Sequence, residues 1–201
     1  FTAVYVALDG KLQGIITLSD TIKPQSKNAI DLLKELGVSD FAMLTGDEKS
    51  SALSVAKKLG IEKFYSNLLP HEKVKHLEAI MANGVKKGKT IFVGDGINDA
   101  PVLALSDVGV AMGGIGSDAA IEAADIVIMD DNLEKLPLAV KIARKTTVIV
   151  WQNIVFALGV KGAILLLASF GIAGMWEAVF GDVGVTLIAV LNATRILHTK
   201  I

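Results

Sequence analysis

Two carboxylates and a carboxamide directly follow an apolar, strand-like segment in the middle of the chain. Thr90–Val93 runs into the sequence Gly94-Asp95-Gly96-Ile97-Asn98-Asp99-Ala100-Pro101. Glycines at 94 and 96 allow a sharp backbone turn, and carboxylates are the hard oxygen ligands that Mg²⁺ prefers. Ligands of parallel α/β sheets bind at the carboxyl ends of the strands. The run therefore predicts a magnesium site, and the alternative is a polar turn in which Asn98 or Asp99 caps a helix.

The segments on both sides of this run alternate between strand-like and helix-like patterns. Strands separated by helices predict an α/β fold with a doubly wound parallel sheet. Asp9-Gly10 between two apolar runs predicts a β-hairpin ahead of that sheet. Pro24 and Gly37 mark the ends of the first expected helix. The expected strands cover 4–8, 12–18, 40–44, 63–65, 90–93, 108–112 and 125–129, and the expected helices cover 24–35, 48–59, 70–82, 98–104 and 117–122.

The composition restricts the possible classes of protein. The 201 residues carry a net charge of −1, which gives no indication of nucleic-acid binding. They include no cysteine, which excludes disulfides and thiolate metal sites within them. Hydrophobic residues make up 52% of the chain, more than is typical of a soluble domain, and they concentrate beyond residue 146. The chain begins inside a strand-like pattern, without an initiator Met or a signal peptide, so we expect a fragment.

Two long apolar segments near the end of the chain predict a pair of transmembrane helices. Residues 147–170 and 176–197 are each long enough to cross a bilayer, which takes roughly 20 residues. Residues 171–174 form a short turn between them. Basic residues flank both outer ends, so the positive-inside rule places residues 1–146 and the C-terminus in the cytoplasm. The alternative is a pair of buried helices in a soluble protein.

Ionisable residues inside these segments bear on their function. Lys161 and Asp182 each lie roughly 10–14 Å from the connecting turn, at 1.5 Å per residue. A charge at that depth is costly unless it is paired or solvated. We expect the two to pair, either within an ion pathway or as a structural pair that fixes helix register. Glu177 is either interfacial or part of an exit route, and Asn153 and Gln152 are candidates for interhelical hydrogen bonds.

The run from Gly94 to Pro101 resembles the hinge motif of P-type ATPases, which are ion pumps with a haloacid-dehalogenase-like phosphorylation domain. Other motifs of that family have counterparts in Thr45-Gly46-Asp47, in Asp20-Thr21-Ile22-Lys23-Pro24 (with Lys in place of the commoner Arg) and in Pro70-His71-Glu72-Lys73. In the membrane segments, Phe156–Lys161 and Met175–Gly184 are similar to the last two helices of the subclass that exports zinc, cadmium and lead. In that subclass the corresponding Lys and Asp belong to the intramembrane metal-site region.

The resemblance implies part of a pump that uses ATP and Mg²⁺ and exports Zn²⁺, Cd²⁺ or Pb²⁺ through an aspartyl phosphate. It implies the end of a nucleotide-binding domain in 1–10, a phosphorylation domain in 11–132, a connecting helix in 133–146 capped by Asn132, and a transmembrane hairpin in 147–201. The implied partners are the other domains of the pump and the lipid bilayer, in a bacterial plasma membrane.

The family's phosphorylated Asp belongs to an Asp-Lys-Thr-Gly-Thr motif, and this sequence does not contain that motif. Two alternatives therefore stay open. One is a non-catalytic remnant of such a pump that binds metal or a partner, and the other is a membrane-anchored haloacid-dehalogenase-type phosphatase.

In the phosphoryl site, the resemblance makes Asp95 and Asp99 the Mg²⁺ ligands, between the turn glycines Gly94 and Gly96, and it gives Asn98 a part in orienting the phosphoryl group. Thr45 and Gly46 donate hydrogen bonds to phosphoryl oxygens. Lys73 neutralises charge on the transferred group, although taken alone it is better interpreted as a solvated surface lysine.

Further roles fall outside that catalytic group. Asp20 and Lys23 lie at the hinge to the nucleotide domain, where Lys23 meets ATP phosphates. Asp47 either contributes to the site or caps the helix 48–59. In the membrane, Asp182 binds the transported metal, Lys161 is its counter-charge and Glu177 is a further candidate ligand.

Overall fold

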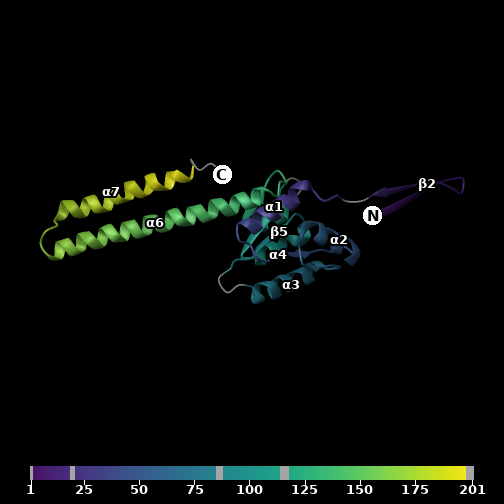
Figure 1. Ribbon diagram of the computed structural model, residues 1–201, viewed down its shortest axis with the longest axis horizontal. Helices are drawn as coiled ribbons and strands as arrows, with labels where there is room; N and C mark the ends of the chain where they lie inside the picture. The colour runs from purple at the N-terminus through teal and green to yellow at the C-terminus, as the bar shows by residue number, and fades with distance from the viewer. Residues whose placement is uncertain (1, 19–20, 85–87, 114–117, 198–201) are drawn as a thin grey trace. The chain divides into compact units, whose positions relative to one another are not determined.

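The computed structural model describes residues 2–18, 21–84, 88–113 and 118–197 (Figure 1). It divides into two compact units, Phe1–Glu134 and Lys135–Ile201. The first unit holds the strands that the structure describes, and the second is a pair of helices.

A β-hairpin opens the first unit. β1 (Thr2–Leu8) pairs antiparallel with β2 (Lys11–Leu18), with a register shift between Val6 and Ala7. Asp9 and Gly10 connect the strands with φ angles of 51° and 73°. Two consecutive positive φ angles make a type I′ turn, whose twist matches that of the strands it joins. The hairpin predicted from Asp9-Gly10 is confirmed.

Strands and helices then alternate, as the sequence predicts. The ends differ from the expected ones by short shifts, and the short helix expected at 98–104 consists of a 3-10 turn followed by an α-helix. The elements are α1 (Pro24–Glu35), β3 (Ala42–Leu44), α2 (Lys49–Leu59), β4 (Lys63–Tyr65), α3 (Pro70–Asn83), β5 (Ile91–Gly94), η1 (Ile97–Asp99), α4 (Ala100–Leu105), β6 (Val108–Met112), α5 (Asp118–Ala123) and β7 (Ile126–Ile128).

Glycines end the first two helices where the sequence indicates. α2 buries Ala52, Ala56 and Leu59 along one face, and Gly60 ends it with φ 69° while its N–H donates to the last carbonyls of the helix. Gly37 follows α1 with φ 83°. Residues with a Cβ rarely adopt this left-handed conformation, so these positions end the helices at little strain.

The strands of the alternating region are parallel. β5, β6 and β7 form one sheet in that order, and β3 and β4 form a second. α4 and α5 pack against each other and against β6, so the buried side chains of Leu103, Ala111 and Ala120 meet at the centre of a small core. The predicted haloacid-dehalogenase-like parallel arrangement is confirmed, with the described strands divided between two ladders.

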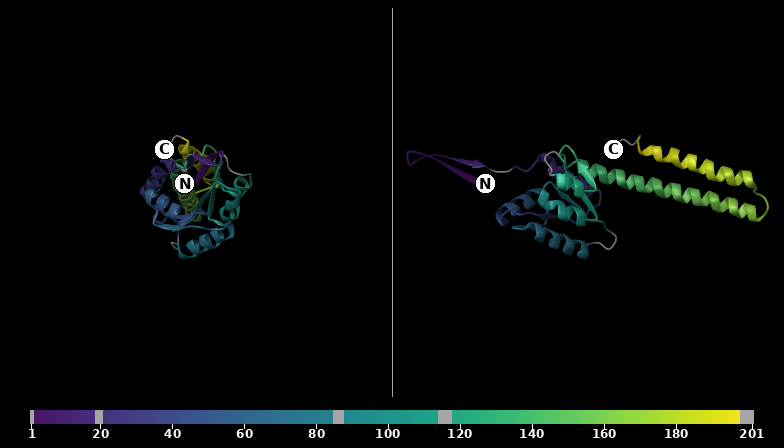
Figure 2. Two further views of the ribbon diagram at one scale, coloured as in Figure 1. Left: turned by 90° about the vertical axis from the view of Figure 1, so that its right-hand side faces the viewer. Right: turned by 180° about the vertical axis from the view of Figure 1, so that it is seen from behind.

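The second unit consists of α6 (Lys135–Ser169) and α7 (Met175–Ala193), followed by the 3-10 turn η2 (Thr194–Ile196). α6 is continuous, as expected for a connecting helix that runs into the first apolar segment. It begins at Lys135, two residues after the expected Leu133. In the turn before it, the Asn132 side chain accepts a hydrogen bond from the Glu134 N–H at 3.0 Å, the kind of bond that an N-cap asparagine makes. Figures 1 and 2 show the two helices side by side.

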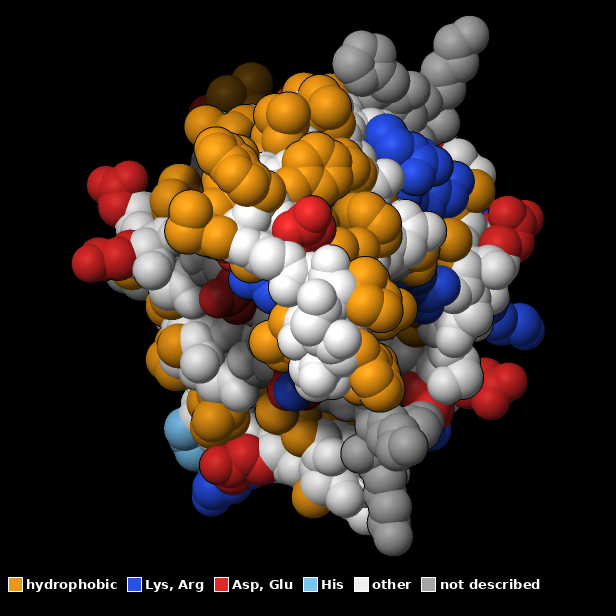
Figure 3. Space-filling view, turned by 90° about the vertical axis from the view of Figure 1, so that its left-hand side faces the viewer, with side chains coloured by type: hydrophobic (Ala, Val, Ile, Leu, Met, Phe, Trp, Pro, Cys, Tyr) orange, Lys and Arg blue, Asp and Glu red, His pale blue; other side chains and the backbone are white. Residues whose placement is uncertain are grey.

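Both helices are long and apolar enough to cross a membrane. Only 6% and 11% of their most hydrophobic windows are buried, so within the described chain they are not the buried core helices of the soluble alternative. The connecting end of the hairpin exposes large apolar side chains, among them Phe170, Ile172, Met175 and Trp176. Figure 3 shows this end, where hydrophobic side chains gather.

Candidate functional site

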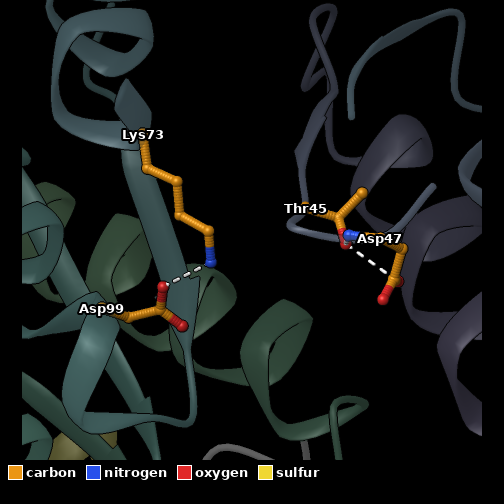
Figure 4. A network of polar contacts seen from close by, with 4 residues as sticks. All are labelled: Thr45, Asp47, Lys73 and Asp99. Atoms are coloured by element: carbon orange, nitrogen blue, oxygen red, sulfur yellow. Dashed lines mark hydrogen bonds and ion pairs between the residues drawn. The ribbon is translucent and has the colours of Figure 1, made fainter. Parts of the chain in front are cut away.

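A largely buried ion pair joins helix α3 to the turn after β5 in the first unit. The Lys73 ammonium lies 2.8 Å from Asp99 Oδ1, and the two side chains are only 16% and 11% exposed (Figure 4). Lys73 comes from the first turn of α3, and Asp99 from the turn that follows β5. The interpretation of Lys73 as a solvated surface lysine is therefore wrong. Asp99 occupies the N-cap position of α4 without making a capping hydrogen bond, so its carboxylate is committed to Lys73.

The turn after β5 is shaped around the Asp99 side chain. A Cβ at Gly94 would lie 2.8 Å from Asp99 Cβ and 3.0 Å from its Oδ2, which is closer than a side chain can approach. Gly96 has no such neighbour, since the nearest atom to a Cβ there is 3.9 Å away. Asp95 and Asn98 are exposed in the same turn, so both remain accessible to a ligand.

Thr45, Gly46 and Asp47 form a second loop at the carboxyl end of β3. The Thr45 hydroxyl donates to Asp47 Oδ2 at 2.9 Å and accepts the Asp47 N–H at 3.1 Å. The helix that follows starts at Lys49 with Glu48 at the N-cap, so the interpretation of Asp47 as that cap is wrong. Figure 4 draws this pair and the Lys73–Asp99 pair, and no contact joins the two pairs among these four residues.

The loop that carries Thr45 is fixed by backbone hydrogen bonds. The Thr45 N–H donates to the Tyr65 carbonyl and the Leu68 N–H donates to the Thr45 carbonyl, each at 3.0 Å. The Asn67 N–H donates to the Asp47 carbonyl at 2.8 Å. The chain from β4 to α3 therefore holds the Thr45 loop and also leads directly into the turn of Lys73.

Two further predicted residues belong to the segment that leads into α1. Lys23 is exposed at the N-cap position of α1. Asp20 lies outside the described residues.

Another ion pair lies at the start of β5. The Lys89 ammonium and the Thr90 N–H both donate to the Asp107 carboxylate, at 2.7 and 2.9 Å. The hydrogen bond from Lys89, which has the larger effect, and the one from the Thr90 N–H hold the pKa of the Asp107 carboxyl below its ordinary value. The contact ties the entry to β5 to the turn before β6, so it helps to position the strand from which Asp95 and Asp99 follow.

The second unit carries the ion pair predicted between the two apolar helices. The Lys161 ammonium lies 2.8 Å from Asp182 Oδ1, with the side chains 55% and 71% exposed in the described chain. Thr186, one turn further along α7, donates to the Asp182 backbone carbonyl at 2.7 Å. Glu177 caps its own helix, because its carboxylate accepts the Gly174 N–H at 2.8 Å.

Asn153 makes the interhelical hydrogen bond for which it was a candidate, and it does so with a residue that sequence reasoning missed. Its amide donates to the Ala189 carbonyl at 3.1 Å, and its Oδ1 accepts the amide of Asn192 at 2.8 Å. Gln152, the other candidate, is exposed. Asn192 lies ten residues beyond Asp182, which places it roughly 80° around the helix from Asp182 at 3.6 residues per turn, so the spacing did not mark it as a partner.

These arrangements are compatible with phosphoryl chemistry in one unit and with a membrane pathway in the other. An ammonium from the first turn of α3, a hydroxyl after β3 and two carboxylates after β5 are groups that can bind and stabilise a transferred phosphoryl group together with a divalent cation. A model of the haloacid dehalogenase-like hydrolases matches residues 1–107, more than half of the chain.

The chain belongs to the haloacid dehalogenase-like hydrolase family.

Relatives within this family resemble the chain over nearly its whole length. It is 56% identical over 199 residues to a cadmium, zinc and cobalt-transporting ATPase of Bacillus subtilis (strain 168), covering 99% of this chain and 28% of that protein. It is 53% identical to a zinc-transporting ATPase of Synechocystis sp. (strain ATCC 27184 / PCC 6803 / Kazusa), covering 97% of this chain and 27% of that protein.

A solved structure agrees with these relatives. The crystal structure of a zinc-transporting PIB-type ATPase superposes with a TM-score of 0.87 at 38% identity, covering 97% of this chain and 31% of that one. The resemblance to heavy-metal P-type ATPases expected from the motifs is confirmed. The chain spans less than a third of the length of each of these three proteins.

Proposed function

We propose that this chain is part of an ATP-driven pump that exports Zn²⁺, Cd²⁺ or Pb²⁺ across a membrane through an aspartyl-phosphate cycle. The observation that carries the proposal is the presence of two lysine–carboxylate pairs in one chain. One pair, Lys73–Asp99, lies in a haloacid-dehalogenase-like fold, and the other, Lys161–Asp182, joins two helices that are long enough to cross a membrane.

In the first unit, the chain's own residues bind and orient the phosphoryl group. Lys73 is held by Asp99 in a fixed position from which it neutralises charge on phosphoryl oxygens. Thr45 and Gly46 donate hydrogen bonds from the loop after β3, and Asn98 orients the group from the turn after β5. Lys23, exposed at the start of α1, meets the phosphates of ATP at the hinge to the nucleotide-binding domain, to which Asp20 also belongs in this proposal. Asp47 contributes to the polar surroundings of the phosphoryl group.

The residues after β5 fit a magnesium ion. Mg²⁺ binds through one or two carboxylates and keeps several waters, and Asp95 presents an exposed carboxylate in the turn where Asp99 is already anchored by Lys73. Asp95 is therefore the main ligand in our proposal, and Asp99 contributes its second oxygen. When bound, the ion supplies positive charge to the phosphate oxygens.

The strands at the centre of the site support the addition of a further strand from the rest of the protein. Among the described strands, β3 pairs with β4 alone and β5 pairs with β6 alone. Each therefore presents one open edge, and open edges accept another strand. We propose that a strand carrying the phosphorylated aspartate joins these edges, so that its end lies between the loops of Thr45 and Asp95.

In the second unit, Asp182 binds the transported cation and Lys161 serves as its counter-charge. Carboxylate oxygens suit Zn²⁺ better than they suit Cu⁺, which prefers sulfur ligands. No three His, Cys, Asp or Glu residues come together among the residues that the structure describes, so the other ligands of the cation come from the remainder of the protein in this proposal. Glu177, which caps α7, is a candidate for the exit route.

The proposed location is a bacterial plasma membrane. Basic residues at the outer ends of α6 and α7 favour a cytoplasmic position for residues 1–146 and for the C-terminus. The proposed partners are the nucleotide-binding domain, the actuator domain and the other membrane helices of the same pump, together with the lipid bilayer. In this arrangement residues 1–10 end the nucleotide-binding domain, 11–132 form the phosphorylation domain and 133–146 connect it to the hairpin at 147–201.

The test is metal-stimulated ATP hydrolysis by the intact protein in lipid vesicles. We expect Zn²⁺ or Cd²⁺ to stimulate hydrolysis and to be transported, and we expect an acid-stable phosphoenzyme. Phosphatase activity without metal dependence would favour the membrane-anchored phosphatase, and metal binding without turnover would favour the non-catalytic remnant.

A further inference from the structure

We infer that Asn153 and Asn192 are positioning residues for the Lys161–Asp182 pair, and this inference rests on the proposed function. They form a hydrogen-bonded chain across the two helices of the second unit. The Asn153 amide donates to the Ala189 carbonyl at 3.1 Å, and the Asn192 amide donates to Asn153 Oδ1 at 2.8 Å. Arg195 then donates to Asn192 Oδ1 at 2.9 Å, which fixes the orientation of the Asn192 amide. Both Asn side chains are half-buried.

The asparagine contacts and the ion pair share one register between antiparallel helices. Asn153 meets Ala189, while Lys161, eight residues later on α6, meets Asp182, seven residues earlier on α7. At 1.5 Å per residue these steps correspond to roughly 12 and 10 Å along the two helices. The steps are nearly equal, so the height of α7 that satisfies Asn153 is also the height that brings Asp182 to Lys161.

The two contacts lie along one groove between the helices. The groove has a volume of about 340 Å³, and its lining includes Asn153, Lys161, Asp182 and Thr186. Alanines at 157, 189 and 193 supply much of the rest of the lining. Small side chains let the helices approach but leave few interdigitating contacts to resist sliding. The hydrogen bonds of Asn153 and Asn192 are therefore the specific contacts that fix the relative height of α6 and α7 at that end of the groove.

Such hydrogen bonds have a larger influence on helix register in a membrane than in water. Lipid tails are as apolar as the helix surfaces, so no hydrophobic force drives the helices into one particular register, and packing and interhelical hydrogen bonds decide it. A slide of one residue displaces Asp182 by about 1.5 Å along the helix axis. That displacement is enough to break a charge-assisted hydrogen bond of 2.8 Å, and it would change how Asp182 presents its carboxylate to a cation.

The test compares three variants of the intact protein in lipid vesicles, each measured for ATP hydrolysis over a range of Zn²⁺ concentrations. Asn153→Ala removes both bonds to α7, and Asn192→Ala removes one and retains the bond to Ala189. Gln152→Ala is the matched control, because it removes an exposed amide from the neighbouring position. Dividing each rate by the amount of folded, inserted protein separates turnover from yield.

We expect Asn153→Ala to raise the Zn²⁺ concentration for half-maximal hydrolysis roughly threefold to tenfold, the range for loss of interhelical hydrogen bonds in membranes. Asn192→Ala should raise it less and Gln152→Ala not at all, with the maximal rate close to wild type in all three.

A role confined to folding would lower the yield or the maximal rate while leaving half-saturation by Zn²⁺ unchanged, and that result would overturn the inference. If Asn153→Ala fails to insert, Asn192→Ala decides, and unchanged half-saturation in it overturns the inference. A wild-type protein without Zn²⁺ stimulation would overturn the proposed function instead, and with it the cation for which the pair is positioned.

Discussion

The Lys73–Asp99 pair and the Lys161–Asp182 pair have the same chemistry and the same 2.8 Å separation, but their surroundings differ. The first pair is 16% and 11% exposed, because α3 and the turn after β5 enclose it. The second is 55% and 71% exposed in the described chain, on two helices that could cross a membrane. The first pair is thus enclosed by the folding of its own unit, whereas the second pair is open to whatever surrounds the helices.

This difference separates two uses of a lysine beside a carboxylate. An enclosed pair fixes the position of its ammonium, which suits a group that must meet a phosphoryl oxygen at a defined point. An open pair leaves a carboxylate oxygen accessible to another ligand. Its lysine can move away from the carboxylate when a cation binds there. The predictions below test whether the two pairs divide their roles in this way, starting with the largest expected effect.

Replacing Lys73 by Ala in the intact protein should reduce phosphoenzyme formation from ATP by about 10²- to 10³-fold, the usual loss when one preorganised electrostatic group is removed. Radiolabelled ATP followed by acid precipitation measures it. Lys75→Ala is the control, because Lys75 is exposed two residues away on the same helix. Equal losses in the two variants would show that Lys73 has no special place in the site.

Replacing Asp182 by Asn should abolish Zn²⁺ transport in vesicles while the protein remains folded and inserted. The amide preserves size and hydrogen bonding, so the loss would report the missing negative charge. Asp182→Ala should lose transport as well, with some loss of stability because Lys161 is left without a partner. Near-normal transport by Asp182→Asn would mean that the Lys161–Asp182 pair has only a structural role. The proposed division of roles between the two ion pairs would then be wrong.

Local patterns in the sequence were sufficient to predict the elements that position both pairs. β4 and β6 begin and end at the expected residues, because each is a short run of strand-forming residues bounded by turn or helix signals. The Lys161–Asp182 pair followed from depth alone, since two helices of a hairpin have a single simple register. Gly60 ended α2 as expected, because only a left-handed residue closes that turn.

Contacts between distant loops could not be predicted in the same way. The Lys73–Asp99 bond joins residues 26 positions apart, across α3 and β5, and no local pattern specifies which carboxylate an ammonium will meet. The position of Asp47 depended on whether its side chain turned toward α2 or toward Thr45, and both choices satisfy the same local preferences.

A smaller effect is expected from adding a methyl group beside each pair. In Gly94→Ala the new Cβ would lie 2.8 Å from Asp99 Cβ, inside a tight turn, so we expect a loss of about 1–3 kcal/mol in the free energy of unfolding. Gly96→Ala is the control, because nothing lies within 3.9 Å of a Cβ there. Denaturant unfolding of the purified protein measures both, and equal stabilities would contradict the enclosure of Asp99.

The corresponding membrane variant is Gly181→Ala. Its Cβ would clash with Ile164 Cδ1, but that atom ends a flexible side chain that can rotate away. We therefore expect Gly181→Ala to perturb thermal unfolding less than Gly94→Ala does, with Gly159→Ala as its control because no atom lies within 4 Å of a Cβ there. A larger loss of stability in Gly181→Ala than in Gly94→Ala would mean that the interface between α6 and α7 is packed more tightly than the turn after β5.

The smallest effect is expected at Lys89–Asp107, whose separation is 2.7 Å and whose side chains are 76% and 23% exposed. The hydrogen bonds from Lys89 and Thr90 lower the pKa of Asp107 from its ordinary value of 3.8. A carboxyl with a lowered folded-state pKa stabilises the fold above its unfolded pKa and loses that contribution as the pH falls through the folded value.

Asp107→Asn should therefore unfold at a slightly lower temperature than wild type at pH 7, and the difference should shrink as the pH falls below 3.8. Thermal unfolding of both proteins across pH measures it, with Asp95→Asn, at the opposite end of β5, as an exposed-carboxylate control. A difference that grows toward low pH would contradict the sign of the pKa shift, and with it the role of Asp107 in holding the entry to β5.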